Sequence, residues 1–345
     1  MRALQLVAPH VIEIRDVAVP AIGPDEILVK VAGAGLCHSD LHLRHLENFP
    51  WGRPMTLGHE TSGHVVGIGD AVEGFNTGAP VLVSLVWSCG RCRPCVEGRD
   101  NVCVTAAGRT RYPVTPGVGP DGGMAEYIKV KARFLEPLGD LDPITSAPLA
   151  DAALTPMHAI NGARHRLGPG ATVGLIGLGG LGQMALQILA ATTSARLVAI
   201  DTDPDKLEVA RTFGAIALSS NEAAVAAVLD LTDGYGADAV FDFVGLQPTV
   251  DLACQVIAPD GALRLVGLGG GRFSFAADSS TRTLPWGVDV RRSYGGTRSD
   301  QRQVLDLAAT GRISVPSCIY PLDDALTAFA DLEAGRVAGR AILVP

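Results

Sequence analysis

Four cysteines fall within one short segment of this chain, at Cys89, Cys92, Cys95 and Cys103. Glycines and a proline between them disfavour regular helix or strand, so the four sulfurs can turn inward around one ion. Zinc takes four thiolates in a tetrahedron at about 2.3 Å, and such a closed site leaves no position for water or substrate. The spacing therefore predicts a structural zinc lobe, with chemistry elsewhere. Two disulfides are the alternative, but seven cysteines in 345 residues without a secretion signal make a poor disulfide scaffold.

Length and charge narrow the class of protein. A chain of 345 residues is expected to form about two domains. A net charge of −8 without a block of lysine or arginine argues against nucleic acid and anionic membrane as partners. Pro9 and His10 interrupt the start before an apolar run reaches signal-peptide length, so we expect a cytoplasmic protein. The apolar stretch 171–191 contains glycines and glutamines that fit a buried strand, turn and helix better than a membrane span.

The composition and pattern of the sequence change near residue 167. The preceding part is rich in glycine, proline and short β-branched runs, which predicts an irregular β-rich domain. Afterwards short apolar strands alternate with helical patterns, as a doubly wound parallel sheet requires. Asp203 and Pro204 suit the start of one helix, and Gly214 suits its end. The strands expected in this second part are 172–176, 196–201, 237–242 and 261–266.

A glycine pattern lies at the first of these strands. Gly177, Gly179 and Gly182 follow the strand and open a helix, and Asp201 ends the next strand. Such a pattern alone is weak, but this context predicts a dinucleotide site. The glycines permit a tight turn, approach of the pyrophosphate and close packing of helix on strand, while the helix N-terminus offers N–H groups. Asp201 is expected to bind the ribose hydroxyls and repel a 2′-phosphate, which indicates NAD.

Three motifs together resemble one family. The cysteine spacing, the segment Gly58-His59-Glu60-Thr61-Ser62-Gly63 and the glycine loop have the sequence and order of the zinc-containing medium-chain alcohol dehydrogenases, and the similarity runs to Pro345. It is closest in type to the bacterial secondary alcohol dehydrogenases. The resemblance implies an α/β fold with a GroES-like catalytic domain at 1–146, a Rossmann NAD-binding domain at 147–288, and a segment at 289–345 that returns to the catalytic domain.

The resemblance also implies a second, catalytic zinc. Carried over by position, its ligands are Cys37, His59 and Asp151, with the aspartate standing where the family's second cysteine is usual. Zinc accepts carboxylate oxygen at about 2.0 to 2.2 Å, and three protein ligands leave a fourth position open. The implied reaction is reversible hydride transfer from a zinc-bound alkoxide to the nicotinamide, giving a ketone or aldehyde.

Further roles come from the same resemblance. Asp40 is expected to support His59, and Glu60 to do the same or to approach the zinc. Ser39 is expected to take the substrate proton, and His42 to deliver it to solvent through the cofactor ribose. A plain surface histidine is the alternative for His42.

The remaining expectations concern cofactor and substrate contacts. His38 and Arg340 are implied to touch the pyrophosphate. The implied substrate pocket has no charged member, which favours secondary alcohols and ketones, including aryl ketones, over polyols. A polyol or sugar dehydrogenase of the same family remains the alternative. The pocket residues are Trp51, Val118, Trp286, Tyr294 and Gly295.

Other classes fit less well. A zinc peptidase needs a second histidine where Gly63 stands, and His64 is off by one position. A sensor or scaffold, or a zinc-free quinone reductase, would lack the catalytic ligands. We therefore expect an enzyme with NAD and two zinc ions per subunit and a small alcohol or ketone as its partner. Relatives favour a homotetramer, with a dimer as the alternative.

Overall fold

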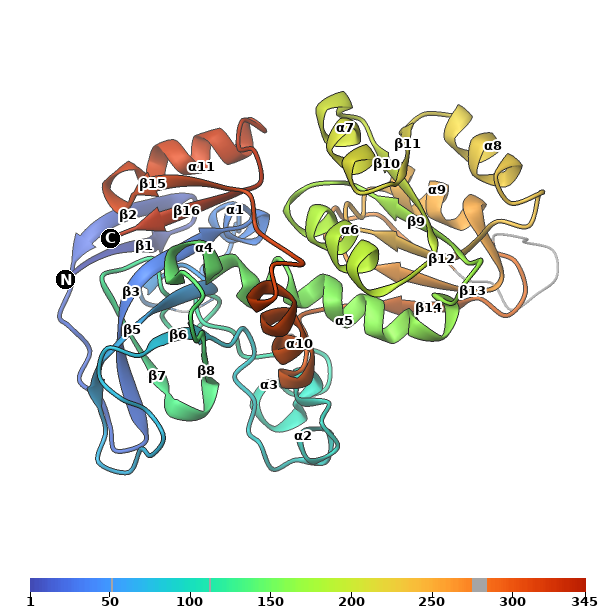
Figure 1. Ribbon diagram of the computed structural model, residues 1–345. Coiled ribbons are helices and arrows are strands. Elements are labelled where there is room, and N and C mark those ends of the chain that lie inside the picture. Colours follow the sequence, from blue (N-terminus) through green and yellow to red (C-terminus); the bar gives the residue numbers. More distant parts are fainter. Residues whose placement is uncertain (51, 112, 275–283) are drawn as a thin grey trace. The chain divides into compact units, whose positions relative to one another are not determined.

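The computed structural model describes residues 1–50, 52–111, 113–274 and 284–345. Its chain forms two compact units (Figure 1). Unit 1 comprises Met1–Leu154, Gly295–Ala309 and Ser314–Pro345, and unit 2 comprises Thr155–Tyr294 and Thr310–Ile313. The compact units end at Leu154 and Tyr294, whereas the sequence predicts domain limits at 146 and 288. A compact unit need not coincide with a family domain, so the predicted limits stay predictions.

Unit 1 is built on two β-sheets. The larger has the order β15-β16-β3-β5-β6-β8 with β7 paired to β3, and the smaller has the order β2-β1-β4. The last strand, β16, runs antiparallel to β3 and so joins the C-terminal segment to the first part of the chain. The strands are β1 (Arg2–Ala8), β2 (Val11–Asp16), β3 (Glu26–Leu36), β4 (Met55–Thr56), β5 (Glu60–Ile68), β6 (Pro80–Val83), β7 (Tyr127–Lys131), β8 (Leu135–Pro137), β15 (Ser317–Pro321) and β16 (Arg340–Val344).

The core of unit 1 lies under these sheets. Alternating positions of β3 are apolar and buried, including Ile27, Val29 and Val31, as a half-buried strand requires. They pack in one cluster with Phe329 and other apolar side chains of the C-terminal segment. The helices of this unit are short except for the two near the C-terminus. They are α1 (His38–Arg44), α2 (Arg93–Val96), α3 (Val104–Ala107), α4 (Pro143–Ser146), α10 (Arg298–Ala309) and α11 (Ala325–Glu333).

Unit 2 contains a six-stranded parallel sheet in the order β11-β10-β9-β12-β13-β14. This is the doubly wound arrangement that the sequence predicts, and the α/β fold class is confirmed. Figure 1 shows α6 and α7 on one side of the sheet and α8 and α9 on the other. The strands are β9 (Thr172–Ile176), β10 (Arg196–Asp201), β11 (Ile216–Ser219), β12 (Ala237–Asp242), β13 (Ile257–Leu265) and β14 (Asp289–Arg292). The helices are α5 (Leu154–Ala163), which begins in unit 1, α6 (Gly180–Thr192), α7 (Pro204–Thr212), α8 (Ala223–Asp230) and α9 (Gln247–Val256).

The local signals in unit 2 mostly act as predicted. Asp203 caps α7 by accepting the N–H of Asp205 at 2.9 Å, and Gly214 follows the helix with a φ of 76°. One strand differs: β13 begins at Ile257 and not at Gly261, and it runs through Asp260, which has a φ of 60°, with an irregular register against β12. Among the described residues no helix is both long and apolar enough to cross a membrane.

Candidate metal centres and cofactor site

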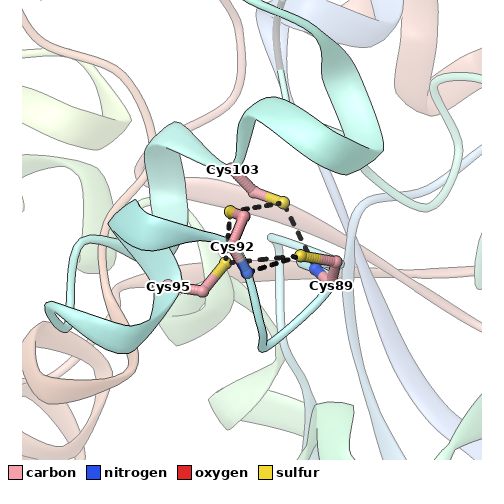
Figure 2. Close-up of side chains that lie close together, drawn as sticks. All are labelled: Cys89, Cys92, Cys95 and Cys103. Atoms are coloured by element: carbon pink, nitrogen blue, oxygen red, sulfur yellow. Dashed lines mark hydrogen bonds between the residues drawn. The ribbon is translucent and has the colours of Figure 1, made fainter.

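The four cysteines of the predicted zinc lobe converge. Figure 2 shows their sulfurs facing one another across a small gap. Neighbouring sulfurs lie 3.4 Å (Cys92 and Cys95), 3.8 Å (Cys92 and Cys103) and 4.0 Å (Cys89 and Cys95) apart. A tetrahedron of thiolates about 2.3 Å from a zinc ion has edges of about 3.8 Å, so the donor set fits that ion. All seven cysteines are described, and each is a free thiol, so the disulfide alternative fails.

Backbone amides already prepare this lobe for a cation. The N–H groups of Arg91 and Cys92 point at the Cys89 sulfur at 3.5 and 3.3 Å. These donors, the one from Arg91 foremost, lower the pKa of Cys89 to about 6. Burial instead raises the pKa of Cys95 to about 12. A bound metal ion would hold both sulfurs as thiolates.

A second cluster contains the residues expected to hold the catalytic zinc. Donor atoms of Cys37, His59, Glu60 and Asp151 all lie within 4.8 Å of one another, and all four residues are buried. The Asp151 carboxylate is 3.8 Å from the Cys37 sulfur and 3.6 Å from His59 Nε2. Cys37 stands between β3 and α1, His59 directly before β5, and Asp151 directly after the short 3-10 turn Ala147–Ala150. Sulfur, imidazole and carboxylate donors at this separation suit zinc.

The electrostatics of this cluster favour a cation. Burial disfavours the charged imidazole, but Asp40 and then Asp151 outweigh it and raise the pKa of His59 well above its usual range. His59 Nδ1 and Asp40 Oδ1 face each other at 3.5 Å, and neither atom has a hydrogen-bond partner. The carboxylates of Asp40 and Asp151 therefore favour a positive charge at this position, which a metal ion bound to His59 Nε2 would supply.

Asp40 also shapes the loop that carries Cys37. Its second oxygen accepts the backbone N–H of Cys37 at 2.9 Å, which closes a capping box at the start of α1. The Ser39 hydroxyl lies 3.6 Å from the Cys37 sulfur. His38 and His42, on the same helix, are exposed. The arrangement brings Asp40 and Ser39 to the cluster, while the roles predicted for His38 and His42 stay predictions.

Glu60 and Arg340 form an ion pair that sequence reasoning missed. Arg340, in β16, donates Nε to the Glu60 carboxylate at 2.8 Å and a second hydrogen bond from Nη2. Nη2 also lies 3.8 Å from Asp151. In this structure the Arg340 guanidinium is buried and bonded to Glu60. The pyrophosphate contact predicted for Arg340 stays a prediction. The family resemblance points to Glu60 and Arg340 separately, but no local sequence pattern predicts a contact between positions 280 residues apart.

The glycine loop of unit 2 has the geometry that each glycine was expected to allow. Gly177 has a φ of 85° at the turn after β9. Gly179 precedes α6, and a side chain there would point into open space. A Cβ at Gly182 would stand 1.9 Å from the Gly177 carbonyl oxygen, so helix and turn pack without room for a side chain.

Asp201 closes the same loop. Its carboxylate accepts the N–H of Leu178 at 2.5 Å and that of Asp203 at 2.9 Å. The side chain is buried at the carboxyl end of β10. Asp201 therefore fixes the position of the glycine loop, a role that the sequence pattern did not predict and that adds to the ribose contact expected of it.

The predicted substrate pocket is described in parts. Trp51 lies outside the described residues. In unit 1, Val118 packs on the core, and a side chain at Gly295 would meet Val86 and Leu85 at 3.4 and 3.5 Å. In unit 2, Tyr294 is half-buried and Trp286 is 88% exposed. The pocket stays a prediction.

Family models and known proteins match both parts of the chain. Residues 23–140 match the model described as alcohol dehydrogenase GroES-like domain, and residues 180–310 match the model described as zinc-binding dehydrogenase. A curated relative from Saccharolobus solfataricus, named D-arabinose 1-dehydrogenase (NADP(+)), is 34% identical over 97% of this chain and 94% of its own length.

Two solved structures extend the similarity to the fold. The alcohol dehydrogenase of Aeropyrum pernix has a TM-score of 0.91 and 34% identity, covering 100% of both chains. The acetophenone reductase of Geotrichum candidum, solved with NAD, has a TM-score of 0.86 and 30% identity, covering 100% of this chain and 97% of the other.

Proposed function

The chain belongs to the zinc-containing medium-chain alcohol dehydrogenases and is an NAD-linked oxidoreductase of this kind, and we propose that it converts secondary alcohols to ketones reversibly. The observation that carries this proposal is the buried convergence of donor atoms from Cys37, His59 and Asp151. We assign these three residues as ligands of a catalytic zinc and the four lobe cysteines as ligands of a structural zinc.

The chemistry follows from these assignments. A zinc ion held by Cys37, His59 and Asp151 would supply Lewis-acid chemistry at the substrate oxygen, which would favour loss of its proton. Asp40 accepts the Cys37 N–H and faces His59 Nδ1 at 3.5 Å, so we propose that it supports both ligands. We propose that Ser39, whose hydroxyl lies 3.6 Å from the Cys37 sulfur, accepts the proton and that exposed His42 releases it to solvent. The glycine loop and Asp201 would hold the dinucleotide, whose nicotinamide would accept hydride from the carbinol carbon.

We assign NAD as the cofactor. A carboxylate at position 201 accepts hydroxyl hydrogen bonds and repels a 2′-phosphate. The Geotrichum enzyme was solved with NAD, and the Saccharolobus relative is named for NADP(+), so the name of a relative does not decide this property. The place of Asp201, at the carboxyl end of β10 and bonded to the glycine loop, supports NAD in this chain.

The substrate class is proposed from the pocket residues. Leu85 and Val86 flank Gly295, and Val118 is also apolar, so nothing among them can pair with the hydroxyls of a sugar. The similarity to an acetophenone reductase supports aryl ketones. A polyol or sugar dehydrogenase is the second candidate, supported by the D-arabinose relative. We further propose a cytoplasmic homotetramer, which light scattering of the purified protein would test.

An NAD(H) absorbance assay decides between these functions. 1-Phenylethanol and 2-octanol should give kcat/KM values at least about tenfold above those of sorbitol and D-arabinose, as one or two unpaired hydroxyls would produce. The reverse order would establish the second candidate.

The metal assignment has its own experiment. Cys37→Ala, His59→Ala and Asp151→Ala should each abolish turnover but leave NADH binding, measured by fluorescence titration. His64→Ala is a matched control on β5, since His64 lies outside the cluster. Full activity in protein shown by metal analysis to lack zinc would refute the assignment.

A further inference from the structure

Helix α10 (Arg298–Ala309) is fixed at its N-terminus by two carboxylates from different parts of unit 1. Asp300 belongs to the helix and accepts the N–H of Thr297 at 2.9 Å, while its own N–H bonds to the Thr297 hydroxyl at 3.1 Å. This reciprocal pair is a capping box. The second carboxylate, Asp100, comes from the cysteine lobe.

Asp100 lies between Cys95 and Cys103 in sequence, in the 3-10 turn Asp100–Val102. Its side chain is buried and accepts the backbone N–H of Arg298 at 3.3 Å. The Arg298 side chain in turn bonds to buried Glu136 of β8 at 2.8 Å. The lobe and the sheet thus hold the first turn of α10 from two directions.

One turn further along, α10 reaches the loop that carries a catalytic ligand. Gln301 is 2% exposed, and its Nε2 donates to the carbonyl oxygen of Leu149 at 3.2 Å. Leu149 lies in the 3-10 turn Ala147–Ala150, two residues before Asp151. The other side-chain atom, Gln301 Oε1, has no hydrogen-bond partner. The single bond to Leu149 therefore defines how this buried amide is placed.

We propose that α10 is a brace that positions Asp151 from the cysteine lobe, with Asp100 and Gln301 as the positioning residues at its two contacts. The inference rests on the proposed function, because it takes Asp151 as a metal ligand. A hydrogen-bonded helix is stiff over one turn, so a movement of its N-terminus also moves Gln301. A displacement of about 1 Å in a supporting residue is enough to loosen a metal ligand. Losing the order of the lobe should then weaken metal binding at Cys37, His59 and Asp151.

The first experiment measures metal release from the zinc-loaded protein into a coloured chelator. Gln301→Leu removes the donor but keeps the bulk, so release from the catalytic site should be at least about fivefold faster, with release from the cysteine lobe unchanged. Gln303→Leu is the matched control, since Gln303 lies on the same helix and donates to the Ser299 carbonyl within it. Gln301→Met is a second variant if the leucine protein folds poorly. Release equal to that of the control would overturn the inference.

A cobalt-loaded sample gives a readout that a loss of stability alone would not change. Visible absorption of Co²⁺ depends on ligand geometry, so Gln301→Leu should shift the catalytic-site bands at temperatures where the protein is fully folded. An unchanged spectrum in folded Gln301→Leu would also overturn the inference.

The second experiment tests the contact at the lobe. Asp100→Ala should raise catalytic-site release in the same direction, whereas Asp100→Asn keeps an acceptor oxygen and should restore slow release. Glu97→Ala is the control, because Glu97 is an exposed lobe carboxylate paired with Arg93 and Arg99. If both contacts act through α10, the double variant Asp100→Ala/Gln301→Leu should release metal no faster than the Gln301→Leu single variant. Additive effects would refute a shared brace. A wild-type protein that holds no metal at Cys37, His59 and Asp151 would instead refute the proposed function.

Discussion

The ion pair between Glu60 and Arg340 crosses strand β3 at a residue without a side chain, Gly35. Both residues are almost wholly buried, and they lie on β5 and β16, which pair with opposite edges of β3. Gly35 of β3 stands directly across from Glu60 in the register. A Cβ at Gly35 would lie 2.0 Å from the Glu60 carboxylate oxygen. The glycine therefore leaves the space through which the ion pair forms.

Gly35→Ala should consequently disrupt this pair. The added methyl group must displace the Glu60 carboxylate, leaving the buried Arg340 charge without its best partner, and we expect a loss of about 2 to 4 kcal/mol of unfolding free energy. Urea unfolding measures this value. Gly168→Ala is the control, because a Cβ there meets no atom within 4 Å. A Gly35→Ala protein as stable as the wild type would contradict the account of the ion pair.

Asp201 acts on both specificity and loop structure. Asp201→Gly with Thr202→Arg should narrow the preference for NAD over NADP by at least about tenfold, since repulsion is removed and a phosphate partner is added. The same change removes the acceptor for the Leu178 N–H, so KM should rise for both cofactors. Asp201→Asn with Thr202→Arg keeps one acceptor oxygen and should raise KM less. Ratios of kcat/KM for the two cofactors test this, and equal use of both by the wild type would show that Asp201 does not face the ribose.

At the scale of elements, the cysteine lobe cannot fold by its own helices. Its α2, α3 and 3-10 turn Asp100–Val102 span only three or four residues each, far below the length at which a helix is stable alone. Several of its apolar side chains are exposed, including Val96 at 74%. The lobe therefore depends on its sulfur cluster for order.

Cys92→Ser and Cys103→Ser should each lower the melting temperature by several degrees and remove one metal ion per chain, because a structural metal contributes folding free energy directly. Cys254→Ser, on α9 outside the lobe, is the control. Metal retention unaffected by either cysteine change would contradict the closed four-sulfur site.

Low pH should also weaken metal binding at the lobe. In the metal-free lobe the N–H of Arg91 lowers the pKa of Cys89 to about 6, so protons compete with the metal for this sulfur as the pH falls through that value, and metal binding at the lobe should weaken there.

The sequence predicts some elements far better than others, for a physical reason. The strands β9, β10 and β12 begin and end where predicted, because each is a buried apolar run bounded by glycine or aspartate. Cysteine spacing likewise predicts the lobe cluster. The Gln301 contact with Leu149 joins positions 152 residues apart and has no local pattern. Such long-range polar pairs depend on the folded topology, and only the structure reveals them.

At the scale of the whole molecule, candidate metal donors and the cofactor loop belong to different compact units. Cys37, His59, Asp151 and the four lobe cysteines are in unit 1, whereas the glycine loop and Asp201 are in unit 2. Each unit has its own buried apolar cluster. Metal and dinucleotide should therefore stabilise separate parts of the chain.

Hydrogen exchange read by mass spectrometry tests this separation. A chelator should speed exchange in peptides around the cysteine lobe and β5, with little change in β9 and β10. NADH added to the metal-free protein at about 100 times its Kd should slow exchange in the 172–203 region, since ligand binding at that excess adds about 2.7 kcal/mol to the stability of the state that binds it. Slower exchange in β16 as well would support the pyrophosphate contact predicted for Arg340. If the chelator instead opened β9 and β10 as much as the lobe, the two units would share one cooperative transition, and the assignment of separate stabilising ligands would be wrong.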